Sequence, residues 1–284
     1  MNSDAPMASP PGKPPQDQLR DLVIGYFIPR AIYAAAYLNI AECLAGGAKN
    51  VEFLAQATGT HAPTLYRVMR ALAGASVFIE DEVGRFRNSA LSDLLRPNVS
   101  GSLRALALLY GDETSWTAWG QILFSLRTGG AAFEHVYGVN CFEYVSTRPE
   151  AAKLFDEAMV NSSSMVNEAI VAAYDFSGLR TLVDVAGGYG ATLCSILKGN
   201  PALHGVLFDM PHVIQGARDY IAQQGLGDQC SAVGGNFFEA VRVGADAYFM
   251  KHILHDWDDD RCIRILSNCR AAMAANGRAL VCEK

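Results

Sequence analysis

Residues 181–191 read TLVDVAGGYGA, and this stretch decides the fold. An apolar run that ends in closely spaced glycines is typical of a buried strand that turns tightly into a helix. Two later stretches have the same form: 208–211 reads FDMP and 251–257 reads KHILHDW, each after an apolar run. Because ligands of open α/β sheets bind beyond the carboxyl ends of the strands, the three stretches predict one nucleotide-type cofactor site with histidines beside it.

Composition limits the classes of protein to consider. The chain has 284 residues, half of them hydrophobic, which is enough for one large or two modest domains. Its net charge of −6 and lack of a long basic run disfavour a nucleic-acid binder. No apolar run approaches the about 20 residues of a membrane helix. Residues 1–18 lack the apolar core of a signal peptide, so we expect a disordered tail on a cytoplasmic protein.

The cysteines and acidic residues predict neither a disulfide framework nor a metal site. The seven cysteines are scattered, with no Cys-x-x-Cys, and are expected to be free thiols packed as small hydrophobes. The acidic run at 258–260 is interpreted as a helix start, with Asp258 as the cap. His252 and His255 are three residues apart, but no third metal ligand accompanies them.

The first 100 residues predict a helical module with a winged helix. Residues 19–48 have helical periodicity, and Pro29 should kink or split that helix. Within 49–97, two short helices precede two strands joined by a turn. A winged helix can read DNA, but acidic and basic residues balance here, whereas phosphate binding demands a basic surface. We therefore interpret 19–100 as a helical module that does not bind DNA.

Two further regions follow. Residues 101–178 are expected to be mostly helical, forming a linker and a pocket region in which Trp116 and Phe142 are candidate contacts for a flat apolar substrate. Residues 179–284 predict a parallel sheet with helices on both faces. The expected strands are 181–185, 205–208, 230–233, 245–250 and 278–282, and the expected helices are 191–198, 213–224 and 258–275.

The glycine turn by itself does not name the cofactor. The dinucleotide fingerprint G-x-G-x-x-G is incomplete, because the sequence from Gly188 lacks the third glycine. Asp209 lies 21 residues after Gly188 (209 − 188) at the end of the next strand, where an acid can accept hydrogen bonds from ribose hydroxyls. The alternative is that Asp209 serves only as a turn or cap residue before Pro211.

Together these stretches resemble the S-adenosylmethionine-dependent small-molecule O-methyltransferases of the plant caffeic acid, hydroxyindole and bacterial antibiotic type. The resemblance implies a Rossmann-like class I methyltransferase domain behind a winged-helix dimerisation domain. It also implies a homodimer, S-adenosylmethionine as cofactor, and an aromatic, phenolic or polyketide-like hydroxyl acceptor of secondary metabolism. We expect no nucleic-acid or membrane partner.

The resemblance carries cofactor roles onto particular residues. The implied cofactor contacts are Gly187, Gly188, Asp209 for ribose, Gly235, Asn236 and Phe237 beside adenine, Lys251, and Ser163 for the methionine moiety. Two residues depart from the family pattern. Ala186 stands where glycine is common, and Asn236 stands where an acid is common, which predicts a modest affinity for the cofactor.

The resemblance also implies the catalytic residues. His255 occupies the position of the family's general base, and an imidazole suits proton abstraction near neutral pH. Glu283 falls where the family has an acid that orients this histidine. Met159 matches a residue that packs on the acceptor ring. Asp256, next to the base in sequence, is expected to point elsewhere.

The chain stops at Lys284, just after the fifth expected strand. The resembled fold normally continues with a helix and an antiparallel strand pair, so we expect a truncated sheet with an exposed edge. Two alternative functions stay open at this point. One is a relative that binds S-adenosylmethionine without methylating, through divergence or truncation, and the other is a winged-helix regulator that senses a small ligand.

Overall fold

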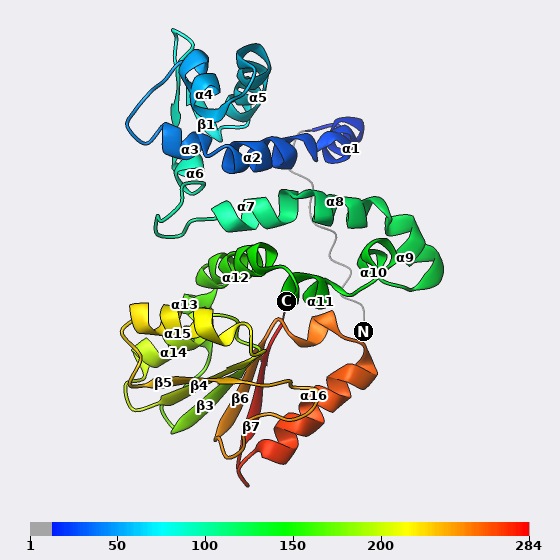
Figure 1. Ribbon diagram of the computed structural model, residues 1–284, viewed down its shortest axis with the longest axis vertical. Coiled ribbons are helices and arrows are strands. Elements are labelled where there is room, and N and C mark those ends of the chain that lie inside the picture. Colours follow the sequence, from blue (N-terminus) through cyan, green and yellow to red (C-terminus); the bar gives the residue numbers. More distant parts are fainter. Residues whose placement is uncertain (1–12, 284) are drawn as a thin grey trace. The chain divides into compact units, whose positions relative to one another are not determined.

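The computed structural model describes residues 13–283 (Figure 1). The chain divides into two compact units, residues 1–132 and 133–284. Most of the tail predicted for 1–18 lies outside the described residues. Its last part was predicted wrongly, because helix α1 begins at Pro15.

Unit 1 opens with helices α1 (Pro15–Ile24), α2 (Phe27–Tyr37) and α3 (Ile40–Cys43). The single helix expected here is divided, but the first break falls at Gly25 and Tyr26, so the prediction that Pro29 kinks or splits the helix is wrong. Pro29 lies in the first turn of α2, where its missing N–H removes no helical hydrogen bond.

A winged helix follows, as predicted. Its elements are α4 (Val51–Thr58), α5 (Ala62–Gly74), β1 (Phe78–Glu80), β2 (Phe86–Asn88) and α6 (Ala90–Asp93). Asn50 caps α4 by accepting the Phe53 N–H, and β1 pairs with β2 in the antiparallel sense. Leu54, Met69 and Phe86 are fully buried and form the centre of this module.

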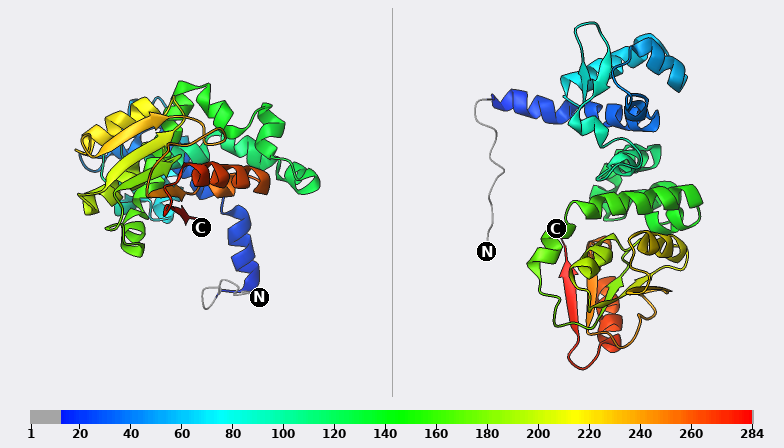
Figure 2. Two further views of the ribbon diagram at one scale, coloured as in Figure 1. Left: turned by 90° about the horizontal axis from the view of Figure 1, so that it is seen from below. Right: turned by 90° about the vertical axis from the view of Figure 1, so that its left-hand side faces the viewer.

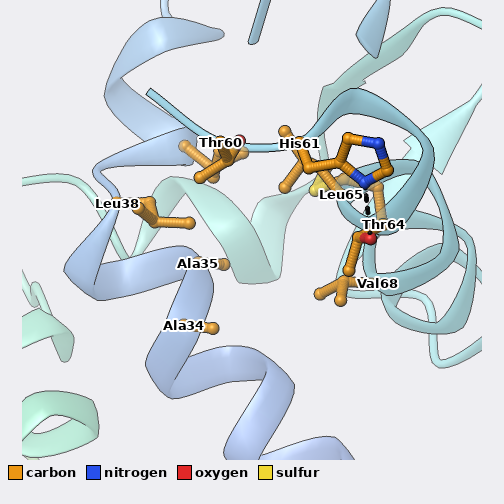
Figure 3. Close-up of a pocket in the computed structure, with 10 residues that line it drawn as sticks. Ala34, Ala35, Leu38, Thr60, His61, Thr64, Leu65 and Val68 are labelled. Atoms are coloured by element: carbon orange, nitrogen blue, oxygen red, sulfur yellow. Dashed lines mark hydrogen bonds between the residues drawn. The ribbon is translucent and has the colours of Figure 1, made fainter. Parts of the chain in front are cut away.

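An apolar pocket of about 280 Å³ lies within unit 1, between α2 and α5, and Figure 3 shows the residues that line it. Ala34 and Leu38 line it from α2, and Leu65 and Val68 line it from α5. His61 is the titratable residue among its lining, and its Nδ1 lies 2.9 Å from the Thr64 Oγ1. The pocket thus has the character of an apolar packing surface, without a set of reactive groups.

The region predicted to be mostly helical is helical. It contains α7 (Arg104–Gly111), α8 (Glu113–Gly120), α9 (Ile122–Thr128), α10 (Ala132–Tyr137), α11 (Cys141–Ser146), α12 (Pro149–Ser164) and α13 (Asn167–Ala173). The division between the units falls at the start of α10, so the expected middle segment 101–178 is shared by both. Between residues 13 and 283, no helix is long and apolar enough to cross a membrane.

Unit 2 contains the predicted parallel sheet. Its strands are β3 (Thr181–Val185), β4 (His204–Asp209), β5 (Cys230–Gly234), β6 (Ala247–Lys251) and β7 (Arg278–Cys282), and their order is β5-β4-β3-β6-β7. The helices between them are α14 (Ala191–Gly199), α15 (Ile214–Gln223) and α16 (Asp259–Ala272). Asp258 caps α16, as predicted, by accepting the Arg261 N–H.

Helices cover both faces of this sheet, with α14 and α15 on one side and α16 on the other (Figures 1 and 2). Leu182 and Leu207 pack in the core beneath α14 and α15. Val183 and Phe208 belong to the core beneath α16. Because successive side chains of a strand point to opposite faces, strands covered on both faces must be apolar at nearly every position. This explains the near-continuous apolar run of β3.

The register gathers the predicted site at one edge. Val185 pairs with Phe208, Asp209 with Gly234, and Lys251 with Cys282, so the carboxyl ends of the strands lie side by side. Strand β7 is the last in the sheet order and is therefore an edge strand, as expected. Val281 on this strand is 47% exposed.

Candidate cofactor and catalytic site

The turn after β3 demands unusual backbone conformations. Ala186, Gly188 and Gly190 have φ angles of 57°, 60° and 83°, in the left-handed region that favours glycine. Gly187 is required for space instead, since a Cβ atom there would lie 2.4 Å from the Asp184 Oδ2. The missing side chains of these glycines let a ligand approach the backbone closely, while the N–H groups of Gly188 and Gly190 bond to Asp209 and Gly187.

Asp209 holds this turn in place. Its Oδ2 accepts the Gly188 N–H at 2.8 Å, and its Oδ1 accepts the Met210 N–H at 2.6 Å. Burial raises the pKa of Asp209 to about 6, against the opposing effect of these two hydrogen bonds. A carboxylate offers about four acceptor positions, so two remain for ribose hydroxyls. Asp209 is thus a turn residue, and it keeps the capacity for its predicted role.

A second carboxyl group, which the sequence analysis did not single out, lies under the turn. Asp184 on β3 is only 2% exposed. Burial raises its pKa to about 7, the positive charge of Lys251 opposes the shift, and Asp209 adds to it. Lys251 therefore lies close enough to act on Asp184. The sequence signal that could have revealed Asp184 is an acidic residue in the middle of an otherwise apolar strand.

The turn after β5 contains the three residues predicted to flank adenine. Position 235 requires glycine for steric reasons, because a Cβ atom there would lie 2.4 Å from the Phe208 Cζ. The Asn236 Oδ1 accepts the Phe238 N–H at 3.0 Å, so its amide stabilises the local turn. Phe237 packs edge-on against Trp257, with ring centroids 6.1 Å apart. The contacts of all three with adenine stay predictions.

The structure brings His255 and Glu283 together. The His255 Nδ1 lies 2.5 Å from the Glu283 Oε2, and the other carboxylate oxygen accepts the N–H groups of Ile253 at 3.0 Å and Leu254 at 2.9 Å. Burial acts to raise the pKa of Glu283, but the hydrogen bonds from His255, Leu254 and Ile253 outweigh it and lower the pKa. Glu283 is therefore a fixed carboxylate acceptor for the imidazole.

The expectation that Asp256 points elsewhere is wrong. Its Oδ1 lies 3.4 Å from the His255 Nε2. Leu254, His255 and Asp256 form a single 3₁₀ turn, which directs neighbouring side chains differently from an extended strand end. Burial raises the pKa of Asp256, while His255 lowers it. The imidazole thus has a carboxyl group near each ring nitrogen.

Aromatic rings surround the neighbouring Trp257. Phe142 stacks on Trp257 with ring centroids 5.6 Å apart and an interplanar angle of 27°. Phe155 meets Phe142 edge-on at 6.1 Å, and Phe238 meets Trp257 edge-on at 4.8 Å. Flat aromatic surfaces of this kind are common in pockets for apolar ligands. The acceptor contact of Phe142 stays a prediction with this support.

The other predicted contacts lie on two helices. Met159 is half-buried and Ser163 is 7% exposed, both on α12 of unit 2. Trp116 lies on α8 of unit 1, where the Arg30 guanidinium sits 4.9 Å from its ring centroid and Tyr26 lies 6.0 Å away. These contacts give Trp116 a packing role within unit 1, and its acceptor contact stays a prediction.

Comparisons with known proteins match both parts of the chain. A family model of the O-methyltransferase dimerisation domain matches residues 21–98, and one of the O-methyltransferase domain matches residues 119–284. The chain belongs to the O-methyltransferase family. This supports the methyltransferase interpretation over a ligand-sensing regulator, and it makes the protein an S-adenosylmethionine-dependent O-methyltransferase.

One similar protein and two solved structures illustrate the membership. The phenazine O-methyltransferase PhzM of Lysobacter antibioticus is 43% identical over 265 residues, which are 93% of this chain and 77% of that protein. The crystal structure of LaPhzM superposes with a TM-score of 0.92 at 42% identity, covering 95% of this chain and 81% of that one. An O-methyltransferase from neocarzinostatin biosynthesis, solved with S-adenosylmethionine and 2-hydroxy-5-methyl naphthoic acid, has a TM-score of 0.77, 29% identity and coverages of 90% and 79%.

The described residues fit S-adenosylmethionine. The cofactor is cationic at sulfur and carries a ribose, and the site offers Asp209 with free acceptor positions beside an open turn. Asp184 adds a second acidic group beneath this turn. An acidic setting favours a cationic ligand electrostatically.

We expect the substitution Ala186→Gly to stabilise the enzyme. Ala186 has a φ of 57°, and a left-handed conformation costs a non-glycine residue about 1–2 kcal/mol. Glycine removes this cost but adds unfolded-state entropy, so the net gain should be about 0.5–1 kcal/mol in urea unfolding. Ala191→Gly, at the start of α14, should destabilise instead. A loss of stability in Ala186→Gly would contradict the assigned strain.

Asp184 should make stability depend on pH. Its pKa rises from an ordinary value of 3.8 to about 7 on folding. As the pH rises, the unfolded state therefore loses this proton at a lower pH than the folded state does. Its contribution to stability is therefore largest below pH 4 and falls as pH rises to 7. Asp184→Asn should raise the free energy of unfolding at pH 8 by up to about 4 kcal/mol and change it little at pH 4.

The matched control for this measurement is Asp228→Asn, since Asp228 is exposed. Denaturant unfolding at both pH values should leave the control close to the parent protein. Equal effects of Asp184→Asn at pH 4 and pH 8 would show that the carboxyl group is not titrating in the folded state.

Proposed function

We propose that the enzyme methylates a hydroxyl group of an aromatic, phenolic or polyketide-like small molecule, with His255 as general base. The observation that supports this most directly is the short contact between His255 and Glu283 at the carboxyl edge of the sheet. Trp257, which follows the 3₁₀ turn of His255 in sequence, stacks with Phe142 of α11, and the two rings supply flat apolar surface for an aromatic acceptor. The related proteins act on or bind aromatic compounds, namely a phenazine and a naphthoic acid.

The cofactor would be held by the turn after β3 and by its neighbours. Gly187 and Gly188 would let it approach the backbone, and Asp209 would accept the ribose hydroxyls. Lys251 and Ser163 would lie beside the remaining parts of the cofactor. When bound, S-adenosylmethionine supplies a methyl group already activated by a sulfonium.

His255 and its two carboxyl neighbours would then move the acceptor proton. Glu283 accepts the Nδ1–H, which leaves the Nε2 lone pair free to take the hydroxyl proton. Asp256, near Nε2, would stabilise the imidazolium that forms. General-base catalysis of this kind typically contributes about 10²–10⁴-fold in rate, and positioning of the two reactants adds to it.

The test is a comparison of His255→Ala and Glu283→Gln with the parent enzyme. His255→Ala should abolish methyl transfer to a responsive phenol. Glu283→Gln should lower kcat by about 10²–10⁴-fold, because its amide N–H₂ facing Nδ1 favours the tautomer without a free Nε2 lone pair. Turnover is measured by transfer of labelled methyl groups.

The control is cofactor binding. Calorimetric titration with S-adenosylhomocysteine should give similar affinities for all three proteins, since neither substitution touches the turn after β3. Unchanged turnover in His255→Ala would rule out this histidine as the base. Lost cofactor binding together with lost turnover would show instead that the substitution disturbs the sheet edge.

We also propose a homodimer, formed through unit 1. The match to a dimerisation domain supports it, and so does the surface of α1. Helix α1 has no buried residue, and its Leu19, Leu22 and Val23 are 63%, 79% and 65% exposed. Large apolar side chains grouped on an exposed helix are typical of a surface that a partner covers.

Leu22→Glu should shift the protein toward monomer, because a carboxylate would be buried without a partner in the interface. Light scattering after size-exclusion chromatography measures the mass directly. Gln16→Glu adds the same charge to an exposed position of α1 and should leave the dimer intact. A parent protein that is monomeric at micromolar concentration would contradict the proposal.

The cysteines support a cytoplasmic location, which we propose as well. All seven are free, and Cys194, Cys230 and Cys269 are buried thiols. Reduced cysteines are typical of cytosolic proteins, whereas chains of oxidising compartments usually pair them.

A further inference from the structure

A buried carboxyl group on α12 has no part in the roles assigned above. Asp156 is 8% exposed, and it precedes Met159 by three positions and Ser163 by seven, so the three share one face of the helix. The Tyr189 side chain lies close enough to act on Asp156 by a hydrogen bond, which lowers the pKa of this carboxyl against the larger effect of burial. Tyr189 lies between Gly188 and Gly190, in the turn that Asp209 holds.

Tyr189 is fixed from its other side as well. A Cβ atom on Gly216 of α15 would lie 2.5 Å from the Tyr189 Cε1 and 2.8 Å from its hydroxyl oxygen, so the ring lies directly on this glycine. Its ring also packs against the core under α14 and α15. The Tyr189 hydroxyl is therefore held in a position that Asp156 reaches from α12.

A second polar attachment lies beyond the other end of the same segment. The Asn167 Nδ2, on α13, donates to the Ala191 carbonyl at 3.2 Å and to the Ser195 Oγ at 3.1 Å, and its Oδ1 accepts the Thr192 hydroxyl at 2.9 Å. Asn167 is 6% exposed. The segment with Met159 and Ser163 is thus attached at Asp156 to the glycine turn and at Asn167 to α14.

We propose that Asp156 and Tyr189 form a positioning clasp that sets the turn after β3 against the helix carrying Met159 and Ser163. This deepens the proposed function and rests on it, since Ser163 and the turn are proposed to hold opposite parts of one cofactor. Neither clasp residue needs to touch the cofactor. Their contact fixes the distance between two surfaces that do.

The pair consists of a hydroxyl donor on Tyr189 and a carboxyl acceptor on Asp156. Burial raises the pKa of Asp156 to about 7, the charge of Asp209 adds to this shift, and the hydrogen bond from Tyr189 opposes it. Burial and Asp156 together raise the pKa of Tyr189 to about 12. A neutral acceptor of the same shape, such as an asparagine amide, should therefore replace Asp156, whereas an apolar side chain should not.

The test is a double-mutant cycle read out as S-adenosylhomocysteine affinity in the full chain. Asp156→Leu and Tyr189→Phe should each weaken binding by about three- to tenfold, the worth of one hydrogen bond. The double variant should be no weaker than the single ones, because either change removes the same contact. Asp156→Asn should restore binding to within about twofold of the parent.

Neighbouring residues serve as matched controls. Glu157→Gln changes an exposed acid on the same helix, and Tyr220→Phe removes a tyrosine hydroxyl from α15, and both should leave the affinity unchanged. Urea unfolding of each variant establishes that it is folded. Asp156→Ala replaces Asp156→Leu in the cycle if the leucine variant does not fold.

Three results would overturn the clasp: single effects that multiply in the double variant, an asparagine variant as weak as the leucine variant, or a parent chain that does not bind. A parent chain that binds S-adenosylhomocysteine but methylates no phenol would contradict the proposed function alone. In that case the cycle in binding affinity still decides the clasp.

Discussion

The hydrogen bond from the Gly188 backbone to the Asp209 side chain is the constraint on which the site depends. It ties the turn after β3 to the end of β4, two strand ends that parallel pairing already places side by side. The turn can take this path because Gly187 leaves room for the Asp184 carboxyl group and because Gly188 and Gly190 tolerate positive φ. The close approach that the backbone offers to the cofactor, the start of α14 and the placing of Tyr189 all follow from this one turn.

Charge is concentrated under the same turn. Burial raises the pKa of Asp156, Asp184 and Asp209, and Lys251 is the cation that acts on Asp184. Buried acids that lie near one another repel when ionised, so their ionisation costs free energy unless a positive charge, from Lys251 or from a cationic ligand, lies beside them. S-adenosylmethionine brings a positive charge at sulfur, and this gives a physical reason why the acids are compatible with its binding.

The catalytic pair shows how a parallel sheet builds chemistry from distant parts of the chain. His255 follows β6 and Glu283 follows β7, and the pairing of these strands brings their ends together. Glu283 accepts two backbone N–H groups as well as the imidazole, so it also fixes the 3₁₀ turn that carries the histidine. Orientation of the base and shape of the turn therefore depend on the same carboxylate.

The sequence by itself determined the parallel sheet, the winged helix, the glycine turn and the positions of Asp209 and His255, because periodicity and residue spacing along the chain are local signals. The role of Glu283 was inferred from the family resemblance, and the structure places its carboxylate in contact with the His255 imidazole. Only the tertiary structure decided that Asp256 lies beside the base, that the Asn236 amide bonds its own turn, and that Asp156 meets Tyr189. These depend on side-chain direction and on contacts between segments far apart in sequence, which no local pattern encodes.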